Sequence, residues 1–156
     1  ICGEPTGKFV TFVAGPMCGI NRTSAEPPSH TECARYAAVA CPFLTRPHMD
    51  RREAGLEKLS TEPAAGHAIM RNPGVTVLWT TRDYHVFGDG KGGHLLRMGE
   101  PQSLEWYAEG RKATRAEVTE SVRTGLPILE EMAAKQEGAT EMLHRMAKDF
   151  ERLYPA

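Results

Sequence analysis

The sequence predicts an α+β fold in which a small module bearing cysteine and histidine precedes an antiparallel sheet and a set of C-terminal helices. The module is indicated by the spacing of Cys2, His30 and Cys33. The sheet is indicated by β-forming residues at 75–80 and by two apolar runs that flank the glycine-rich segment 88–93. The helices are indicated by capping patterns and helical spacing in the last third of the chain. With 156 residues, 40% of them hydrophobic, the chain can bury one core.

Residues 29–33 predict the start of a helix that carries two metal ligands. Ser29 is a good N-cap, and Glu32, three residues later, completes a capping box. His30 then takes the first helical position and Cys33 follows one turn later, so that both side chains lie on one face. The partial positive charge of the helix N-terminus favours the thiolate of Cys33, which is the form that binds metal.

A structural zinc ion needs four ligands, and Cys2 is the third candidate. Ile1-Cys2-Gly3-Glu4 resembles the second half of a C-x2-C-G zinc knuckle, whose other cysteine would precede Ile1. Within the chain, Cys18 is the candidate for the fourth ligand. The predicted ligands of Zn²⁺ are therefore Cys2, Cys18, His30 and Cys33.

Cys41 fits this site poorly. It follows Cys33 by eight residues, which is about 12 Å along a helix. Two sulfur atoms that each lie about 2.3 Å from one zinc ion cannot be that far apart. Two alternatives to a zinc site stay open. The four cysteines could be ordinary buried thiols, or they could form disulfides.

The residues between Cys2 and His30 predict a β-hairpin. Residues 9–13 are rich in β-formers, Gly15-Pro16 marks a turn, and residues 18–22 would form the returning strand. A knuckle, a hairpin and a helix with two ligands in its first turn is the order of a treble-clef zinc finger. We therefore expect residues 1–58 to form a treble-clef-like zinc module, packed as one compact unit with an α+β part at 75–156.

Several runs of the chain resemble a group of uncharacterised bacterial and phage proteins. The runs are Gly15-Pro16-Met17-Cys18, Asn21-Arg22, Glu26-Pro27-Pro28-Ser29-His30, Cys33-Ala34, Cys41-Pro42-Phe43-Leu44, Glu109-Gly110-Arg111 and 113–118. That group carries a C-x2-C-G start and an H-x2-C treble-clef-like zinc motif. The resemblance spans most of the chain and implies that architecture and a phage or prophage origin, but no activity.

The middle of the chain predicts a sheet. Residues 75–80 form the clearest strand, and residues 84–87 and 94–98 form a hairpin with a glycine-rich tip. Before them, 43–49 predicts an extended segment, 50–59 a short helix and 60–74 a long loop.

The C-terminal third predicts helices. Pro101 fits the first position of a helix that reaches Ala108, and Gly110 would cap it. Thr114-x-x-Glu117 is a capping box that starts a second helix, which Gly125-Leu126-Pro127 should break or kink before it resumes at 128–135. Residues 141–153 predict the last helix.

Two apolar stripes in these helices predict packing within the chain or against a partner, including a second copy. Their members are Leu126, Ile128, Leu129, Met132, Met142, Leu143, Met146 and Phe150.

Other patterns indicate chemistry more weakly. His30-Thr31-Glu32 matches the H-x-E of zinc deaminases, but the P-C-x2-C that should follow is absent. The glycine-rich segment 88–93 lacks the G-K-[ST] ending of a phosphate-binding loop and indicates a hairpin tip. His85 and His94 could face each other across the hairpin as a second metal or acid–base pair, but lone histidines are more often ordinary surface or core residues. A basic cluster could contact phosphate or simply face solvent, and its arginines are Arg46, Arg51 and Arg52.

Charge and hydropathy narrow the function classes. The net charge of −1 gives no global electrostatic case for nucleic acid. No apolar run approaches the ~20 residues that span a bilayer, and an H-x2-C spacing suits a reducing cytoplasm. We expect a small intracellular protein, with structural zinc, that binds a protein or nucleic acid. The alternative is a metal-dependent enzyme that acts on nucleic acid, of nuclease or deaminase type.

Overall fold

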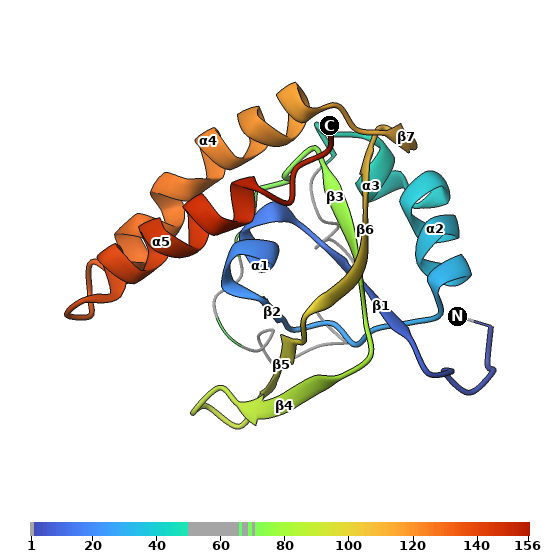
Figure 1. Cartoon of the computed structure of the whole chain (residues 1–156), viewed down its shortest axis with the longest axis horizontal. Helices are drawn as coiled ribbons and strands as arrows, with labels where there is room; N and C mark the ends of the chain where they lie inside the picture. The colour runs from blue at the N-terminus through green and yellow to red at the C-terminus, as the bar shows by residue number, and fades with distance from the viewer. Residues whose placement is uncertain (1, 50–65, 67–68, 70) are drawn as a thin grey trace, which may run out of the picture.

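Two antiparallel sheets form the centre of the protein, which is described by a computed structural model covering residues 2–49, 66, 69 and 71–156 (Figure 1). The four-stranded sheet has the order β1-β3-β6-β7, and the three-stranded sheet has the order β2-β5-β4. In chain order the strands are β1 (Val10–Ala14), β2 (Thr23–Ser24), β3 (Thr76–Thr81), β4 (Tyr84–Gly88), β5 (His94–Met98), β6 (Pro101–Ala108) and β7 (Arg111–Lys112).

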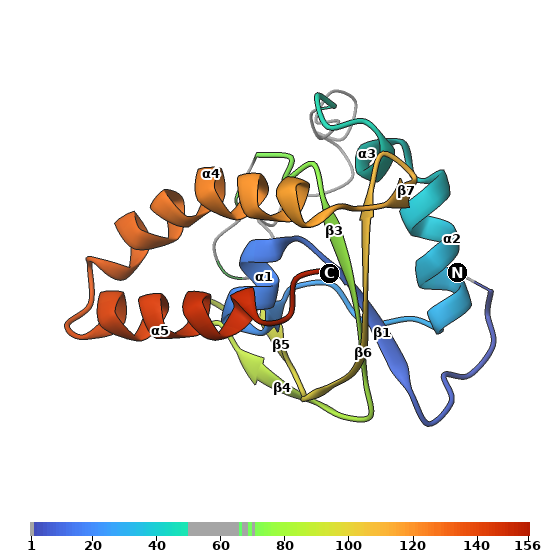
Figure 2. The ribbon, with the colours of Figure 1, turned by 45° about the horizontal axis from the view of Figure 1, so that its top comes forward.

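Helices cover both faces of the larger sheet. Figure 2 shows α2 on one face and α1, α4 and α5 on the other. The helices are α1 (Pro16–Asn21), α2 (Thr31–Ala40), α3 (Pro42–Thr45), α4 (Arg115–Ala133) and α5 (Ala139–Glu151). The chain therefore has a mixed α+β architecture with antiparallel sheets and C-terminal helices.

Alternation along the strands divides the core into two clusters. On the side of α1, α4 and α5, the larger cluster includes Phe12, Val77 and Trp79, which are fully buried. On the side of α2, the smaller cluster consists of Ala34, Ala38, Leu78 and Tyr107. Since neighbouring residues of a strand point to opposite faces, β1 and β3 contribute to both clusters, and Val13 is the β1 residue that packs against the smaller one.

The larger cluster joins the two ends of the chain. Its members come from β1 and α1 as well as from β3, β6, α4 and α5. The Trp106 indole N–H donates a 2.9 Å hydrogen bond to the carbonyl of Leu153 and fixes the C-terminal residues against β6. Residues of both predicted parts, 1–58 and 75–156, therefore share one core.

Several predictions from the sequence are confirmed. The strand expected at 75–80 is β3, the expected hairpin is β4 and β5, and the last helix is α5. Thr114 caps α4 as predicted, because its hydroxyl accepts the N–H of Glu117 and the Glu117 carboxylate accepts the N–H of Thr114.

The helix predicted at 101–108 is wrong, since these residues form β6. They pair with β3 over most of its length, with Val77 opposite Trp106 and Thr76 opposite Tyr107. Leu104, Trp106 and Ala108 then point to the larger cluster at every second position. Pairing with a fully buried strand outweighs the favourable position of Pro101 for a helix start.

The hairpin predicted between residues 9 and 22 is also wrong. β1 pairs with β3 instead, and Pro16–Asn21 forms α1 with Pro16 in its first turn. The extended segment predicted at 43–49 is wrong in part, because Pro42–Thr45 forms α3. The helix predicted at 50–59 and most of the loop at 60–74 lie outside the described residues.

The C-terminal helices pack mainly within the chain. α4 runs through Pro127 without the predicted break. Leu129, Leu143 and Phe150 are buried, and Leu126, Met132 and Met146 pack against the larger cluster. Met142 is 56% exposed. Most side chains of the two apolar stripes therefore pack in or against the core of the chain.

The contact between α1 and α5 gives a test of this packing. A Cβ atom at Gly19 would lie 2.6 Å from the Phe150 ring, and inserting atoms into a packed core costs about 1–3 kcal/mol. We expect Gly19→Ala to lower the free energy of unfolding by that amount in urea denaturation. Gly7→Ala is the control, because nothing lies within 4 Å of a Cβ there. Equal stabilities of the two variants would contradict the packing.

Candidate metal centre

The first turn of α2 presents two ligands beside the N-terminal segment. The sequence predicts Ser29 as the N-cap of this helix, and that prediction is wrong. Its backbone forms an isolated bridge with β1, with Ser29 N–H donating to the Thr11 carbonyl at 2.9 Å and Thr11 N–H donating in return at 2.8 Å. This pairing keeps Ser29 extended, so the N-cap is His30. The predicted capping box does not form, but His30 and Cys33 remain one turn apart.

Three of the predicted ligands converge at this point. The ligand atoms of Cys2, His30 and Cys33 all lie within 4.8 Å of one another, and Cys2 Sγ lies 3.2 Å from His30 Nδ1. These three form the group that the structure brings together among its described residues. Cys18 does not join them; it lies on α1 and packs against the larger core cluster.

A glycine in the left-handed conformation directly follows Cys2. Gly3 has a φ of +79°, a left-handed conformation that glycine adopts without steric cost. The backbone N–H of Glu4 donates to the Cys2 sulfur, which is the main reason that the pKa of Cys2 falls to about 7. Backbone N–H groups that point at a sulfur atom stabilise its thiolate, the form that binds metal.

Between the lowered pKa of Cys2 and the raised pKa of Cys33, the two sulfurs hold one proton. The Cys33 thiol donates to Cys2, and this hydrogen bond raises the pKa of Cys33. Cys2 therefore ionises first. A divalent cation at this point would replace the shared proton and hold both sulfurs as thiolates.

The His30 ring is oriented by the N-terminal segment. Its Nε2 lies 2.8 Å from the Pro5 carbonyl oxygen, which can only accept a hydrogen bond, so Nε2 carries the hydrogen. This contact, followed by the one with Cys2, raises the pKa of His30. In the neutral ring, Nδ1 then carries the lone pair and faces the Cys2 sulfur at 3.2 Å. A ligating histidine ordinarily donates its other N–H to a carbonyl or carboxylate in this way.

The donor set suits a soft, tetrahedral cation. Two thiolates and one imidazole are typical zinc ligands, and zinc–ligand distances of about 2.0–2.3 Å place the ligand atoms roughly 3.3–3.8 Å apart. The three ligand atoms of this group lie close to that arrangement. The group can therefore hold a metal ion with small side-chain movements.

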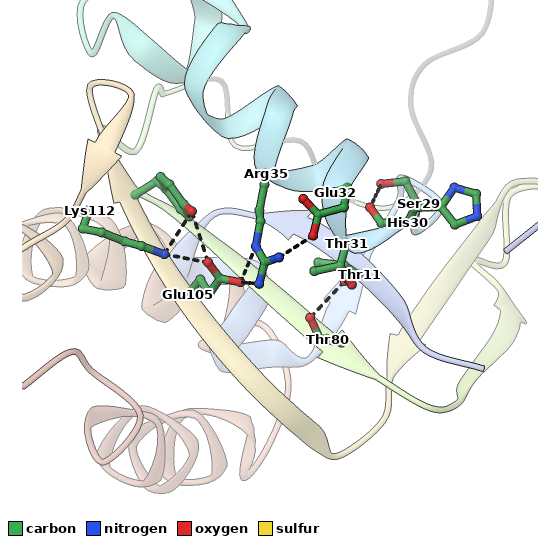
Figure 3. Close-up of polar contacts among 10 residues, drawn as sticks. Thr11, Ser29, His30, Thr31, Glu32, Arg35, Thr80, Glu105 and Lys112 are labelled. Carbon is green, nitrogen blue, oxygen red and sulfur yellow. Dashed lines mark hydrogen bonds and ion pairs between the residues drawn. The ribbon is translucent and has the colours of Figure 1, made fainter. Parts of the chain in front are cut away.

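A network of ion pairs between Glu32, Arg35, Glu105 and Lys112, here called the brace, holds α2 on the sheet close to the ligands (Figure 3). Arg35 of α2 contacts the Glu105 carboxylate of β6 at 2.6 Å, and Lys112 of β7 contacts its other oxygen, also at 2.6 Å. Glu32, in the first turn, is paired with Arg35 at 2.5 Å. The Arg35 guanidinium, followed by Lys112, holds the pKa of Glu105 at about 2.

Hydrogen bonds between threonine hydroxyl groups join the same turn to β1 and β3. The Thr11 hydroxyl lies 2.9 Å from the hydroxyl of Thr31 and 2.9 Å from that of Thr80 (Figure 3). Thr31 directly follows His30, so the position of the histidine backbone depends on this chain of hydroxyl groups. The sequence alone did not reveal the roles of Pro5, Thr11 and Glu105, since a backbone carbonyl and contacts between distant strands have no local sequence signal.

The remaining predicted residues lie elsewhere. Arg46 is exposed just after α3, and Arg51 and Arg52 lie outside the described residues. His85 and His94 do not face each other across the hairpin, because His85 lies opposite Arg97 and His94 opposite Gly88.

The glycine-rich segment is a hairpin tip, as predicted. One oxygen of the Asp89 carboxylate accepts the N–H groups of Lys91 and Gly93, at 2.8 and 2.9 Å. The other oxygen accepts the N–H of Gly66 at 3.2 Å. These bonds hold the tip closed.

Comparison of the chain with protein-family models, curated proteins and solved structures finds no match. The resemblance drawn from the sequence therefore stays a prediction. In the described part of the chain, no helix combines the length and the apolar character needed to cross a membrane.

The brace predicts a stability that depends on pH. Because the folded pKa of Glu105 lies below its ordinary value of 4.5, its stabilisation is present above about pH 4.5 and is lost as the pH falls toward 2. Glu105 is mostly buried but its partners are half exposed, so we expect Glu105→Gln to lower the free energy of unfolding by about 2 kcal/mol at pH 7. Urea denaturation at several pH values, with chelator present, would measure this difference.

The exposed Glu131→Gln is the matched control, and we expect it to leave stability unchanged. A deficit of Glu105→Gln that persisted undiminished at pH 2 would contradict the electrostatic origin of the effect.

Proposed function

We propose that the chain is a zinc-binding module of treble-clef-like type, in which the metal is structural and the module binds a protein or nucleic-acid partner. The observation that carries this proposal is the convergence of Cys2, His30 and Cys33 from two segments distant in sequence. The knuckle at Gly3 and the first turn of α2 correspond to the two ligand-bearing parts of a treble clef. The hairpin that usually joins them is replaced here by β1 and α1.

The location of the site supports a structural role. Residues 2–9 contribute no helix or strand and their side chains are exposed. In contrast, α2 is fixed to the sheet by the small core cluster and the brace. A zinc ion held by Cys2, His30 and Cys33 would join the exposed segment to the fixed helix. Thiolate ligands of this kind persist in a reducing, intracellular compartment.

Metal analysis tests this proposal directly. We expect about one zinc ion per purified chain, lost in Cys33→Ser. Because metal binding and folding are coupled, Cys33→Ser should lower the melting temperature by on the order of 10 °C. Cys41→Ser is the matched control, since Cys41 lies at the other end of α2 and outside the ligand group. Full stability of a zinc-free protein would reject a structural zinc.

A second candidate function is a metal-dependent enzyme acting on nucleic acid. It is favoured by one observation, that the described ligand group has three members. A fourth protein ligand would give a closed structural site, whereas a water molecule in the fourth position would give an open site capable of chemistry.

One binding experiment separates these functions. If nucleic acid is the partner, replacing Arg46, Arg51 and Arg52 by alanine should weaken binding to a labelled oligonucleotide. It should also reduce the slope of log affinity against log salt by about 0.7–0.9 for each phosphate that the variant no longer neutralises. Fluorescence anisotropy at several salt concentrations measures both effects.

The control replaces three exposed cations of α4 and α5, Arg123, Arg145 and Lys148, by alanine and should retain binding. Absence of binding at low salt would reject nucleic acid and leave a protein partner. Recovery of a shortened oligonucleotide, in amounts that depend on Cys33, would support the enzyme instead.

A further inference from the structure

The sulfur atoms of Cys2 and Cys33 are close enough to react with each other. Their Sγ atoms lie within 4.8 Å of each other. A disulfide needs a separation of about 2.05 Å. The two sulfur atoms therefore need to move toward each other by no more than the difference between these two distances.

The backbone permits this approach from one side. Cys33 belongs to α2, which is held by the sheet, whereas Cys2 lies in the exposed segment 2–9 with Gly3 beside it. Movement of Cys2 toward Cys33 disturbs no strand pairing and no core contact of the larger cluster.

The other two thiols are excluded by their positions. Cys18 packs against the larger core cluster from α1. Cys41 follows Cys33 by eight residues, at the end of α2, which separates them by about 12 Å along the helix axis. Among the four cysteines, Cys2 and Cys33 are the pair that the fold brings together.

We propose that Cys2 and Cys33 form an intrachain disulfide when a peroxide reaches the site, and that this bond releases the bound zinc. The proposal rests on the zinc site proposed above and makes that site sensitive to oxidants. It assigns to these two residues a regulatory role in addition to their role as ligands.

The chemistry balances with hydrogen peroxide as the oxidant. The Cys2 thiolate attacks one peroxide oxygen; a sulfur–oxygen bond forms, the oxygen–oxygen bond breaks, and the departing hydroxide takes a proton to give water. The Cys33 thiolate then attacks the Cys2 sulfur; a disulfide bond forms, the sulfur–oxygen bond breaks, and the departing hydroxide takes a proton from solvent to give a second water. The two sulfurs lose two electrons in total and the peroxide gains them. Zinc keeps its charge, and it leaves because a disulfide offers no thiolate ligand.

The test uses the full chain with zinc bound and with Cys18→Ser and Cys41→Ser introduced together. Zinc content is measured first, and hydrogen peroxide is then added in steps while a chromogenic chelator reports free zinc. We expect release of about one zinc ion for each peroxide consumed. Peptide mass spectrometry should show a Cys2–Cys33 linkage with the loss of two hydrogens, and dithiothreitol with added zinc should restore the loaded protein. The wild-type chain, mapped in parallel, guards against a folding defect of the double variant.

The outcomes separate the two proposals. Retention of zinc by protein that carries the Cys2–Cys33 linkage would overturn the proposed zinc release. Oxidation of Cys2 to sulfinic acid without a linkage to Cys33 would overturn the disulfide. If the first measurement finds no zinc, the proposed metal site fails, and the same peptide map of the metal-free protein still decides whether Cys2 and Cys33 join. Cys2→Ser and Cys33→Ser are the matched controls, and each should abolish the linkage.

Discussion

The arrangement of the candidate site depends on the hydrogen bonding of β1 along both of its edges. One edge pairs with β3 over the whole strand, from Val10 opposite Thr81 to Ala14 opposite Val77. The other edge carries the two backbone bonds to Ser29. Because Ser29 is fixed in an extended conformation one residue before the N-cap, α2 starts where β1 dictates. The pairing of β1 with β3 and with Ser29 therefore fixes the position of the ligands in the first turn of α2.

Two sets of interactions then hold α2, and they differ in kind. Packing of Ala34 and Ala38 on Leu78 is apolar and independent of pH. The contacts of Glu105 with Arg35 and Lys112 are charged and fail when the carboxylate is protonated. The ligand group is a third attachment, and it joins the helix to a segment that the other two do not reach. If the group holds the proposed zinc ion, loss of that ion would release residues 2–9 while the other two attachments keep α2 on the sheet.

Predictions from the sequence were correct for features that depend on residues close along the chain. They were wrong where pairing with a strand distant in sequence determines the secondary structure. The spacing of His30 and Cys33 located the site because both lie on one helical turn, whatever the exact first residue of that turn. The capping box at Thr114 formed because its two members are local. By contrast, Pro101 and Gly110 have the chemistry of helix ends, yet pairing with β3 makes the residues between them a strand. Gly15-Pro16 ends the strand β1 as expected, but these two residues do not reveal whether a strand or a helix follows.

The contacts of Asp89 set how the chain tolerates changes in length. Its carboxylate closes the hairpin tip and at the same time binds the backbone of Gly66, twenty-three residues earlier. Residues inserted between Asp89 and Gly93 would move the N–H groups that the carboxylate holds, and the tie to Gly66 would be lost with them. The turn at Gly138 between α4 and α5 is exposed and has open space around it. A tag, a label or a fused domain is therefore better placed at Gly138 than in the glycine-rich tip, although the two turns look equally permissive in the sequence.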